Sequence, residues 1–178
     1  IPMLLAAGLT GNVENAVVIV TKQLHDWHDQ NPFLKSINWK NGLEAGIRIT
    51  NLIYARKILS LYPAEQTKET IKLIDELAFD HFNFLRTHLS LYSSANNHLL
   101  FELMGIFMVA INYDFAQAKF WRNKSFNWLI EELFKQTHAD GFTKEQSSHY
   151  HAEVMNIYAV VFAEAKKNEI QIPGPGTC

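Results

Sequence analysis

The apolar residues of this chain recur at spacings of three and four, which is the pattern of one buried face of an α-helix. Few glycines or prolines interrupt this pattern between residues 12 and 172. We expect helices over residues 12–29, 42–61, 64–92, 97–111, 115–137 and 143–167. The sequence therefore predicts an all-α fold.

Two of the expected helices carry additional signals. The segment 97–111 is strongly apolar and should be the most buried helix, and Asn96 before it is a residue type typical of helix N-caps. The last helix should begin at Thr143, because Thr143 and Gln146 have the spacing of a capping box. Long helices with short connections favour antiparallel neighbours, so we expect helical hairpins that form a bundle or a segment of an (α/α) toroid.

Composition and charge bound the class of protein. A length of 178 residues fits one domain, and 48% hydrophobic with 19% charged residues is typical of a soluble globular chain. The net charge of −2 comes without a basic tract, so no nucleic-acid partner is expected. The longest apolar run, residues 99–111, is shorter than the roughly 20 residues that cross a bilayer, so no membrane span is expected.

The two ends of the sequence bear on its completeness. Cys178 is the single cysteine, so no disulfide can form within the chain and no CxxC motif exists. The first residues lack an initiating methionine, a basic region and the cleavage pattern of a signal peptide. We expect the chain to be the interior of a longer protein.

Three segments between the expected helices carry clusters of polar and aromatic residues that are unusual for plain connections. They span residues 31–41, 96–98 and 138–151. Asparagine at the start of a helix also has an ordinary explanation, which is capping. The second cluster therefore indicates a function only in the company of the other two.

These clusters resemble three sequence blocks of the heparinase II/III-like polysaccharide lyases, a family that also includes alginate lyases. NPFLKSINWKNGLEAGIRITNLIYA is similar to the family's tryptophan-containing loop and following helix, and ANNHLLFEL to its Asn-His block. QTHADGFTKEQSSHYH resembles its Asp-Gly, Glu-Gln-Ser and Tyr-His block. The resemblance covers about residues 31–155 and implies part of an incomplete (α/α) toroid with its substrate cleft at one rim. The matching residues are Trp39, Glu44, Arg48, Asn97, His98, Glu102, Asp140, Gly141, Glu145, Gln146, Ser147, Tyr150 and His151.

The resemblance implies β-elimination from a uronic-acid-containing polysaccharide, in which the C5 proton is removed and the 4-linked sugar leaves. Removal of that proton builds negative charge on the neighbouring carboxylate, which neutral or positive donors must meet. Asn97 offers an amide and His98 an imidazole for this purpose. Both are expected in the first turn of a helix, where free backbone N–H groups favour an anion.

Tyr150 is the implied acid, base or both. A phenol can donate a proton to the leaving oxygen, and a phenolate can accept one from carbon. A phenolate at neutral pH needs nearby cations, which Arg48, His98 or His151 could supply. From the sequence alone, a tyrosine inside an apolar helix is more often a core residue, and it is the match of all three blocks that favours the catalytic role.

For substrate binding, the resemblance points to Trp39, Arg48, Glu102, Gln146 and His151. The indole of Trp39 could stack on a sugar ring, and Arg48 could hold a carboxylate or sulfate bidentately. Glu44 and Glu102 would orient Arg48 or His98 rather than carry protons. Glu44 and Arg48 also have the spacing of an i,i+4 pair on a helix surface.

Members of this family continue from the toroid into an antiparallel β-rich domain, which contributes a further catalytic histidine and, in some members, a metal site. No strand-rich segment occurs in this sequence, so the chain should be a fragment that is weak or inactive alone. We expect no cofactor and no metal in this part. The resemblance implies a periplasmic or secreted protein whose partner is an acidic polysaccharide such as heparan sulfate, heparin, alginate or an exopolysaccharide.

Three other interpretations remain open from the sequence. A glycoside hydrolase on a similar toroid would need two opposed carboxylates, which Glu102, Asp140 and Glu145 could provide. A metal enzyme is suggested by eight histidines, including His25 with His28 and His149 with His151. However, no HExxH motif occurs, and the first pair fits a solvated helix face. The third is a non-catalytic helical domain that binds an acidic polysaccharide or a protein partner.

Overall fold

The computed structural model describes residues 10–62 and 65–173, and these residues form an all-α fold, as predicted. An isolated antiparallel bridge between Thr137 and Thr143 is the only strand-like pairing in the described part. Two short 3-10 helices, η1 (Ile37–Trp39) and η2 (Tyr92–Ser94), lie in connections. The longer helices are α2 (Val13–Gln30), α3 (Gly42–Leu59), α4 (Glu65–Leu85), α5 (Asn97–Asn112), α6 (Ala118–Gln136) and α7 (Ser148–Lys167).

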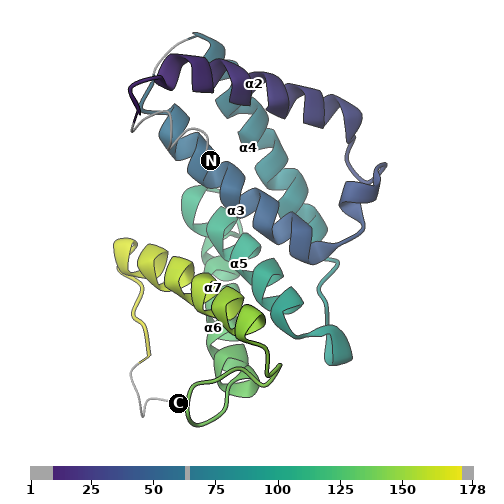
Figure 1. Cartoon of the computed structure of the whole chain (residues 1–178), viewed down its shortest axis with the longest axis vertical. Coiled ribbons are helices and arrows are strands. Elements are labelled where there is room, and N and C mark those ends of the chain that lie inside the picture. The colour runs from purple at the N-terminus through teal and green to yellow at the C-terminus, as the bar shows by residue number, and fades with distance from the viewer. Residues whose placement is uncertain (1–9, 63–64, 174–178) are drawn as a thin grey trace.

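The helices alternate in direction along the chain, as expected for helical hairpins. Helices α3, α5 and α7 run the same way, and α5 packs against both of the others (Figure 1). Helices α2, α4 and α6 run roughly the opposite way, and α4 and α6 both contact α5. The N-terminal ends of α3, α5 and α7 therefore lie at one side of the molecule. We call this side the N-terminal rim and define it as residues 40–44, 88–98 and 145–151.

Helix α5 is the centre of the core, which confirms the prediction from its apolar sequence. Thirteen of its residues are buried, from Asn97 to Ala110 with the exception of His98. Its approach to α3 is close because Gly46 and Gly105 face each other at the crossing. A Cβ atom built on Gly105 would lie 2.9 Å from the Cα of Gly46, and one on Gly46 would overlap the carbonyl of Phe101.

Two helix boundaries differ from the sequence prediction. Helix α4 ends at Leu85 rather than near residue 92. The prediction that the last helix begins at Thr143 is wrong, because Thr143 pairs with Thr137 instead. The actual N-cap of α7 is Ser147, whose hydroxyl accepts the backbone N–H of Tyr150 at 3.5 Å.

Candidate functional site

A polar pocket of about 730 Å³ opens at the N-terminal rim between the starts of α3 and α5 and the end of α4. Lys40, His88 and His98 line it, and none of its lining residues carries a carboxylate. Its other lining residues are Asn41, Gly42, Phe84, Leu89, Ser90, Ser93, Ser94 and Asn96. Cationic and hydroxyl-bearing walls without carboxylates favour an anionic ligand.

Asn97 lies at the start of α5, and its side chain is largely enclosed, since the residue is 7% exposed. Its backbone N–H donates to Oε1 of Glu145 at 3.0 Å. This hydrogen bond joins the second and third sequence blocks. It also takes up one of the backbone N–H groups that the sequence analysis assigned to the substrate.

His98 is exposed and lines the rim pocket, whereas Glu102, one turn further along α5, is fully buried. The carboxylate of Glu102 accepts the backbone N–H of Ser90 at 2.6 Å and its hydroxyl at 2.7 Å. Burial raises the pKa of Glu102, while the hydrogen bonds from Ser90 and the nearby His98 oppose that rise. The expected roles of Glu102 in binding substrate and in orienting Arg48 are therefore corrected: it fixes Ser90 in the wall of the pocket.

Replacing Glu102 by alanine should release the connection between α4 and α5. Because the Ser90 N–H then loses its acceptor, hydrogen exchange of that amide should accelerate by about one order of magnitude or more. Ser90→Ala is the matched control, because it removes only the hydroxyl and leaves the backbone N–H bonded to Glu102. Unchanged protection of the residue 90 amide in Glu102→Ala would contradict this role.

Tyr150 lies in the first turn of α7 and is 45% exposed. Its hydroxyl makes no hydrogen bond within the described residues, so the phenol is accessible to a ligand at the rim. Gln146 is also exposed, with a positive φ of 54° in the turn before α7. The structure therefore leaves both side chains in solvent.

His151 belongs to the rim by its position in the chain, but its ring lines a different pocket from the rim pocket. Its ring stacks on Phe142 with centroids 4.5 Å apart, and its Nδ1 is buried without a partner in the described part of the chain. The ring lines a mostly apolar pocket of about 240 Å³ between α6 and α7, with Leu133, Val154 and Phe162 among the other walls. His151 is thus separate from the rim pocket.

Trp39 and Arg48 belong to an aromatic cluster beneath the rim. Trp39 is 3% exposed, and its indole N–H donates to the carbonyl of Asn31 at 3.1 Å. Phe33, Phe84 and His81 surround its ring. Its burial contradicts the expectation that Trp39 stacks on a sugar, because no ring face is open to solvent.

The guanidinium of Arg48 is held within the same cluster. Its Nη2 donates to the carbonyl of Asn38 at 3.0 Å, and its centre lies 4.8 Å from the centroid of Trp27. Burial lowers the pKa of Arg48, and nearby Glu44 opposes this effect. Arg48 is therefore committed to internal contacts, and it is not a residue of the rim pocket.

His81 completes this cluster as a fully buried, neutral imidazole. Its Nδ1 lies 2.7 Å from the carbonyl of Leu77, and its Nε2 lies 3.1 Å from Nη1 of Arg48. Since arginine can only donate, Nε2 accepts and Nδ1 carries the proton. Burial lowers the pKa of His81 to about 3, and the positive charge of Arg48 contributes to this lowering. The hydrogen bond to the carbonyl of Leu77 acts in the opposite direction.

The stability of the fold should consequently depend on His81 in acid. Between its ordinary pKa of 6.5 and about 3, the unfolded chain binds a proton that the folded chain does not. Stability should therefore fall as pH decreases through this window, with a slope approaching roughly 1.4 kcal/mol per pH unit from this group. Chemical unfolding at several pH values should show a smaller slope in His81→Gln, and an equal slope would contradict the assignment.

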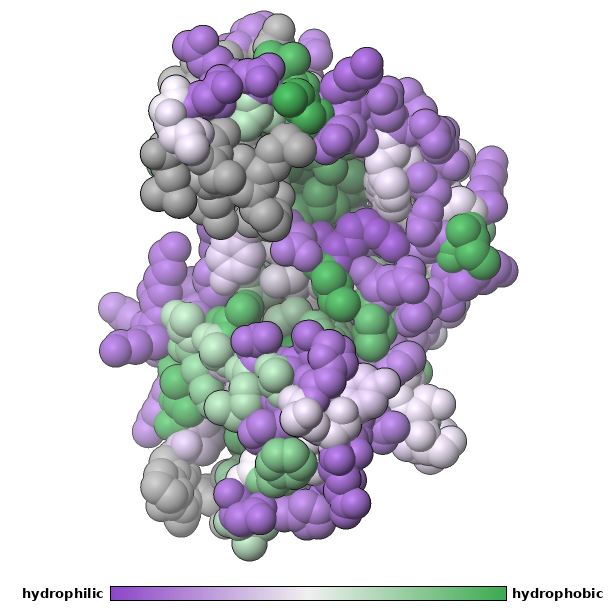
Figure 2. Space-filling model, viewed as in Figure 1, coloured by the Kyte–Doolittle hydropathy of each residue, from purple (hydrophilic) through white to green (hydrophobic). Residues whose placement is uncertain are grey.

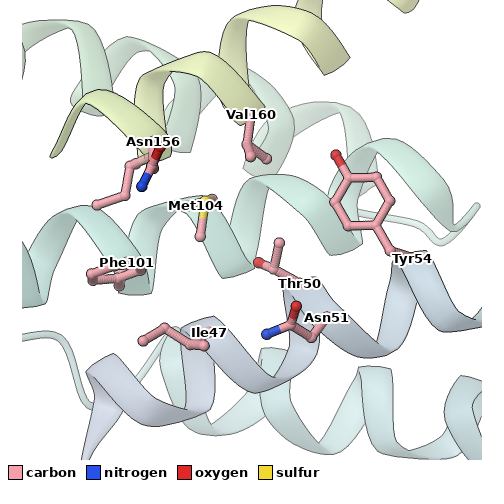
Figure 3. Close-up of a pocket in the computed structure, with 9 residues that line it drawn as sticks. Ile47, Thr50, Asn51, Tyr54, Phe101, Met104, Asn156 and Val160 are labelled. Carbon is pink, nitrogen blue, oxygen red and sulfur yellow. The ribbon is translucent and has the colours of Figure 1, made fainter. Parts of the chain in front are cut away.

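A second pocket of about 190 Å³ lies between α3 and α7, with α5 as its floor. Figure 3 shows Ile47 and Asn51 on the α3 side, Asn156 and Val160 on the α7 side, and Met104 between them on α5. In Figure 2, hydrophobic residues gather mainly in the lower half of the molecule, where α7 lies. None of the candidate site residues lines this groove, although several of its walls, such as Ile47 and Phe101, belong to the first two sequence blocks.

Comparison with known proteins shows to which family this chain belongs. The model described as heparinase II/III N-terminus matches residues 9–175. The chain belongs to this family. The resemblance read from the three sequence blocks is thereby confirmed.

Two heparin-sulfate lyases are among the relatives of this heparinase II/III N-terminus chain. The lyase of Bacteroides stercoris is 26% identical over 174 residues, which cover 88% of this chain and 26% of that protein. The lyase of Pedobacter heparinus is 26% identical over 154 residues, covering 84% of this chain and 23% of that protein. The chain thus spans about a quarter of the length of these relatives. No solved structure matches it significantly.

Two basic residues of the rim pocket in this heparinase II/III N-terminus chain, Lys40 and His88, are not among the residues predicted from the sequence. Lys40 directly precedes the N-cap of α3, and His88 follows the end of α4. His88 was hidden because residues 86–92 were expected to be helical. Lys40 could have been noticed as a cation next to the tryptophan of the first block.

Two further findings concern metals and membranes. The described residues hold no group of three or more histidine, cysteine, aspartate or glutamate side chains placed to bind a metal ion. None of the described helices combines the length and apolar character that crossing a membrane requires.

Proposed function

We propose that this chain is the helical part of a polysaccharide lyase that cleaves a uronic-acid-containing acidic polysaccharide by β-elimination at the N-terminal rim. The observation that carries the proposal is the hydrogen bond between Asn97 and Glu145, because it ties the start of α5 to the segment that leads into Tyr150. The family and its heparin-sulfate lyase relatives support the same reaction class.

In this proposal the rim pocket receives the uronate. His98 from the pocket wall and Asn97 from the adjoining first turn of α5 meet its carboxylate, while Lys40 adds positive charge and His88 a further imidazole. Tyr150 acts as base, acid or both. As phenolate it takes the C5 proton, the electron pair of that bond forms the C4–C5 double bond, and the phenol then protonates the departing oxygen at C4.

The proposed substrate rests on the names of the relatives, and the proposed setting rests on the family resemblance alone. The relatives' names point to heparan-type chains, and an alginate or another uronate polymer is the alternative. An incomplete (α/α) toroid, a β-rich domain elsewhere in the full-length protein and a periplasmic or secreted location complete it. The non-catalytic binding domain is the competing interpretation, since it uses the same pocket without turnover.

No observation favours the hydrolase interpretation. Glu102 is fully buried and bound to Ser90, and Glu145 has one oxygen on Asn97 and the other enclosed by protein. Asp140 is exposed and accepts the N–H of Phe142 at 3.0 Å. Hydrolysis needs two carboxylates that reach the scissile bond, and only one of these three is exposed.

The experiment that tests the proposal follows the ultraviolet absorbance of uronic acid polysaccharides incubated with the full-length protein. A lyase creates an unsaturated uronate that absorbs, whereas a hydrolase or a binding domain does not. We expect absorbance to rise with at least one of heparan sulfate, heparin or alginate. Chain cleavage without absorbance would indicate a hydrolase, and binding without cleavage would indicate a binding domain.

A further inference from the structure

The side chain of Glu145 reaches from the segment before α7 to the first turn of α5. Helix α5 lacks a local cap, because its N-cap residue, Asn96, makes no side-chain hydrogen bond there. Glu145, 48 positions after Asn97, supplies the acceptor instead. Its Oε1 lies 3.0 Å from the backbone nitrogen of Asn97. A carboxylate at a helix N-terminus is also stabilised by the helix dipole.

The segment that carries Glu145 is fixed on both sides. Before it, Thr143 forms the bridge to Thr137 at the end of α6. After it, Ser147 caps α7 through the N–H of Tyr150. Because both neighbours are held, the bond from Glu145 transmits the position of this segment to the start of α5.

The second oxygen of Glu145 is enclosed by the protein, although the residue itself lines a pocket of about 330 Å³ together with Asn96 and Gln136. Oε2 is buried and has no hydrogen-bond partner within the described residues. An oxygen enclosed in this way cannot exchange a proton with a substrate at the rim. The described contact of the Glu145 carboxylate is its bond to Asn97, which favours a role in placing its neighbours.

We propose that Glu145 is a positioning residue that sets the separation between Asn97 and Tyr150, a role that rests on the proposed function of these two groups. Glu145 thereby keeps two groups at a fixed separation. These are Asn97, which meets the substrate carboxylate, and the phenol of Tyr150, which moves the proton. Small errors in such a geometry reduce the rate of the reaction far more than they reduce binding.

The test compares three variants of the full-length protein in steady-state kinetics. Glu145→Ala removes the acceptor and should lower kcat about 10- to 100-fold with KM changed less than about threefold. Glu145→Gln retains an acceptor oxygen and should restore kcat to within about threefold of wild type. Glu131→Ala removes an exposed carboxylate near the end of α6 and should leave both parameters unchanged. Equal losses in the alanine and glutamine variants would overturn the proposal, because they would show that the charge matters rather than the bond.

Hydrogen exchange of the Asn97 amide provides a readout that does not depend on turnover. We expect faster exchange in Glu145→Ala and near wild-type exchange in Glu145→Gln. Equal protection in the wild-type protein and Glu145→Ala would overturn the proposal even if the lyase is active. If instead the wild-type protein cleaves no polysaccharide, the proposed function fails, while the exchange result still decides whether Glu145 holds Asn97.

Discussion

Replacing Tyr150 by phenylalanine is expected to lower the rate of elimination by the full-length protein at least about 100-fold, because the change removes the group that moves the proton. The side chain is 45% exposed and its hydroxyl bonds to no described residue, so the fold does not depend on that hydroxyl. Thermal unfolding and oligosaccharide binding should therefore stay near wild type. Initial rates of absorbance increase measure the effect.

Tyr62→Phe is the matched control for this change. Tyr62 is 38% exposed and follows the C-terminal end of α3, away from the N-terminal rim, so its hydroxyl should be dispensable. Undiminished turnover in Tyr150→Phe would refute the catalytic role. Equal losses in both tyrosine variants would point to a general effect on stability instead.

Replacing Gly46 by alanine is expected to destabilise the fold by about 3 kcal/mol, in spite of the better helix propensity of alanine. The new methyl group would overlap the backbone carbonyl of Phe101, which cannot rotate away as a side chain could. Helices α3 and α5 would have to separate at the crossing where Gly46 meets Gly105. Urea unfolding measures the change in the free energy of unfolding.

Asn51→Ala serves as the control for Gly46→Ala. Asn51 is on the same helix but exposed, so alanine should change the free energy of unfolding by less than about 0.5 kcal/mol. A Gly46→Ala protein as stable as wild type would show that α3 and α5 do not approach as closely as described.

The spacing of apolar residues was sufficient to predict the helices and the central place of α5, because burial of a helix face is a repeating local signal. The three sequence blocks converge at one rim because successive helices alternate in direction. The blocks precede or begin α3, α5 and α7, and these three helices share a direction.

The wrong predictions concern residues whose surroundings are set by contacts with segments distant in the sequence. Trp39 follows a polar loop, yet it is buried because His81 and Phe84 of α4 enclose it. The residues of a capping box are present from Thr143 to Gln146, but pairing with Thr137 holds Thr143 outside the helix. Neither partner can be recognised from local spacing.

Glu102 illustrates the same limit for the candidate site. Its partner Ser90 lies in a stretch whose apolar residues continue the helical pattern of α4, so the sequence offered no reason to place a loop there. A buried carboxylate needs hydrogen-bond donors. That rule predicts that Glu102 has partners, but it does not identify them.

A crystal structure of the full-length Tyr150→Phe protein with a bound uronic acid oligosaccharide tests most directly whether the N-terminal rim is the catalytic site. We expect a uronate carboxylate at the rim pocket to contact the side chains of His98 and the neighbouring Asn97, with C5 of that sugar facing the ring at position 150. An oligosaccharide bound elsewhere on the protein, or with its uronate turned away from Asn97 and His98, would contradict this expectation.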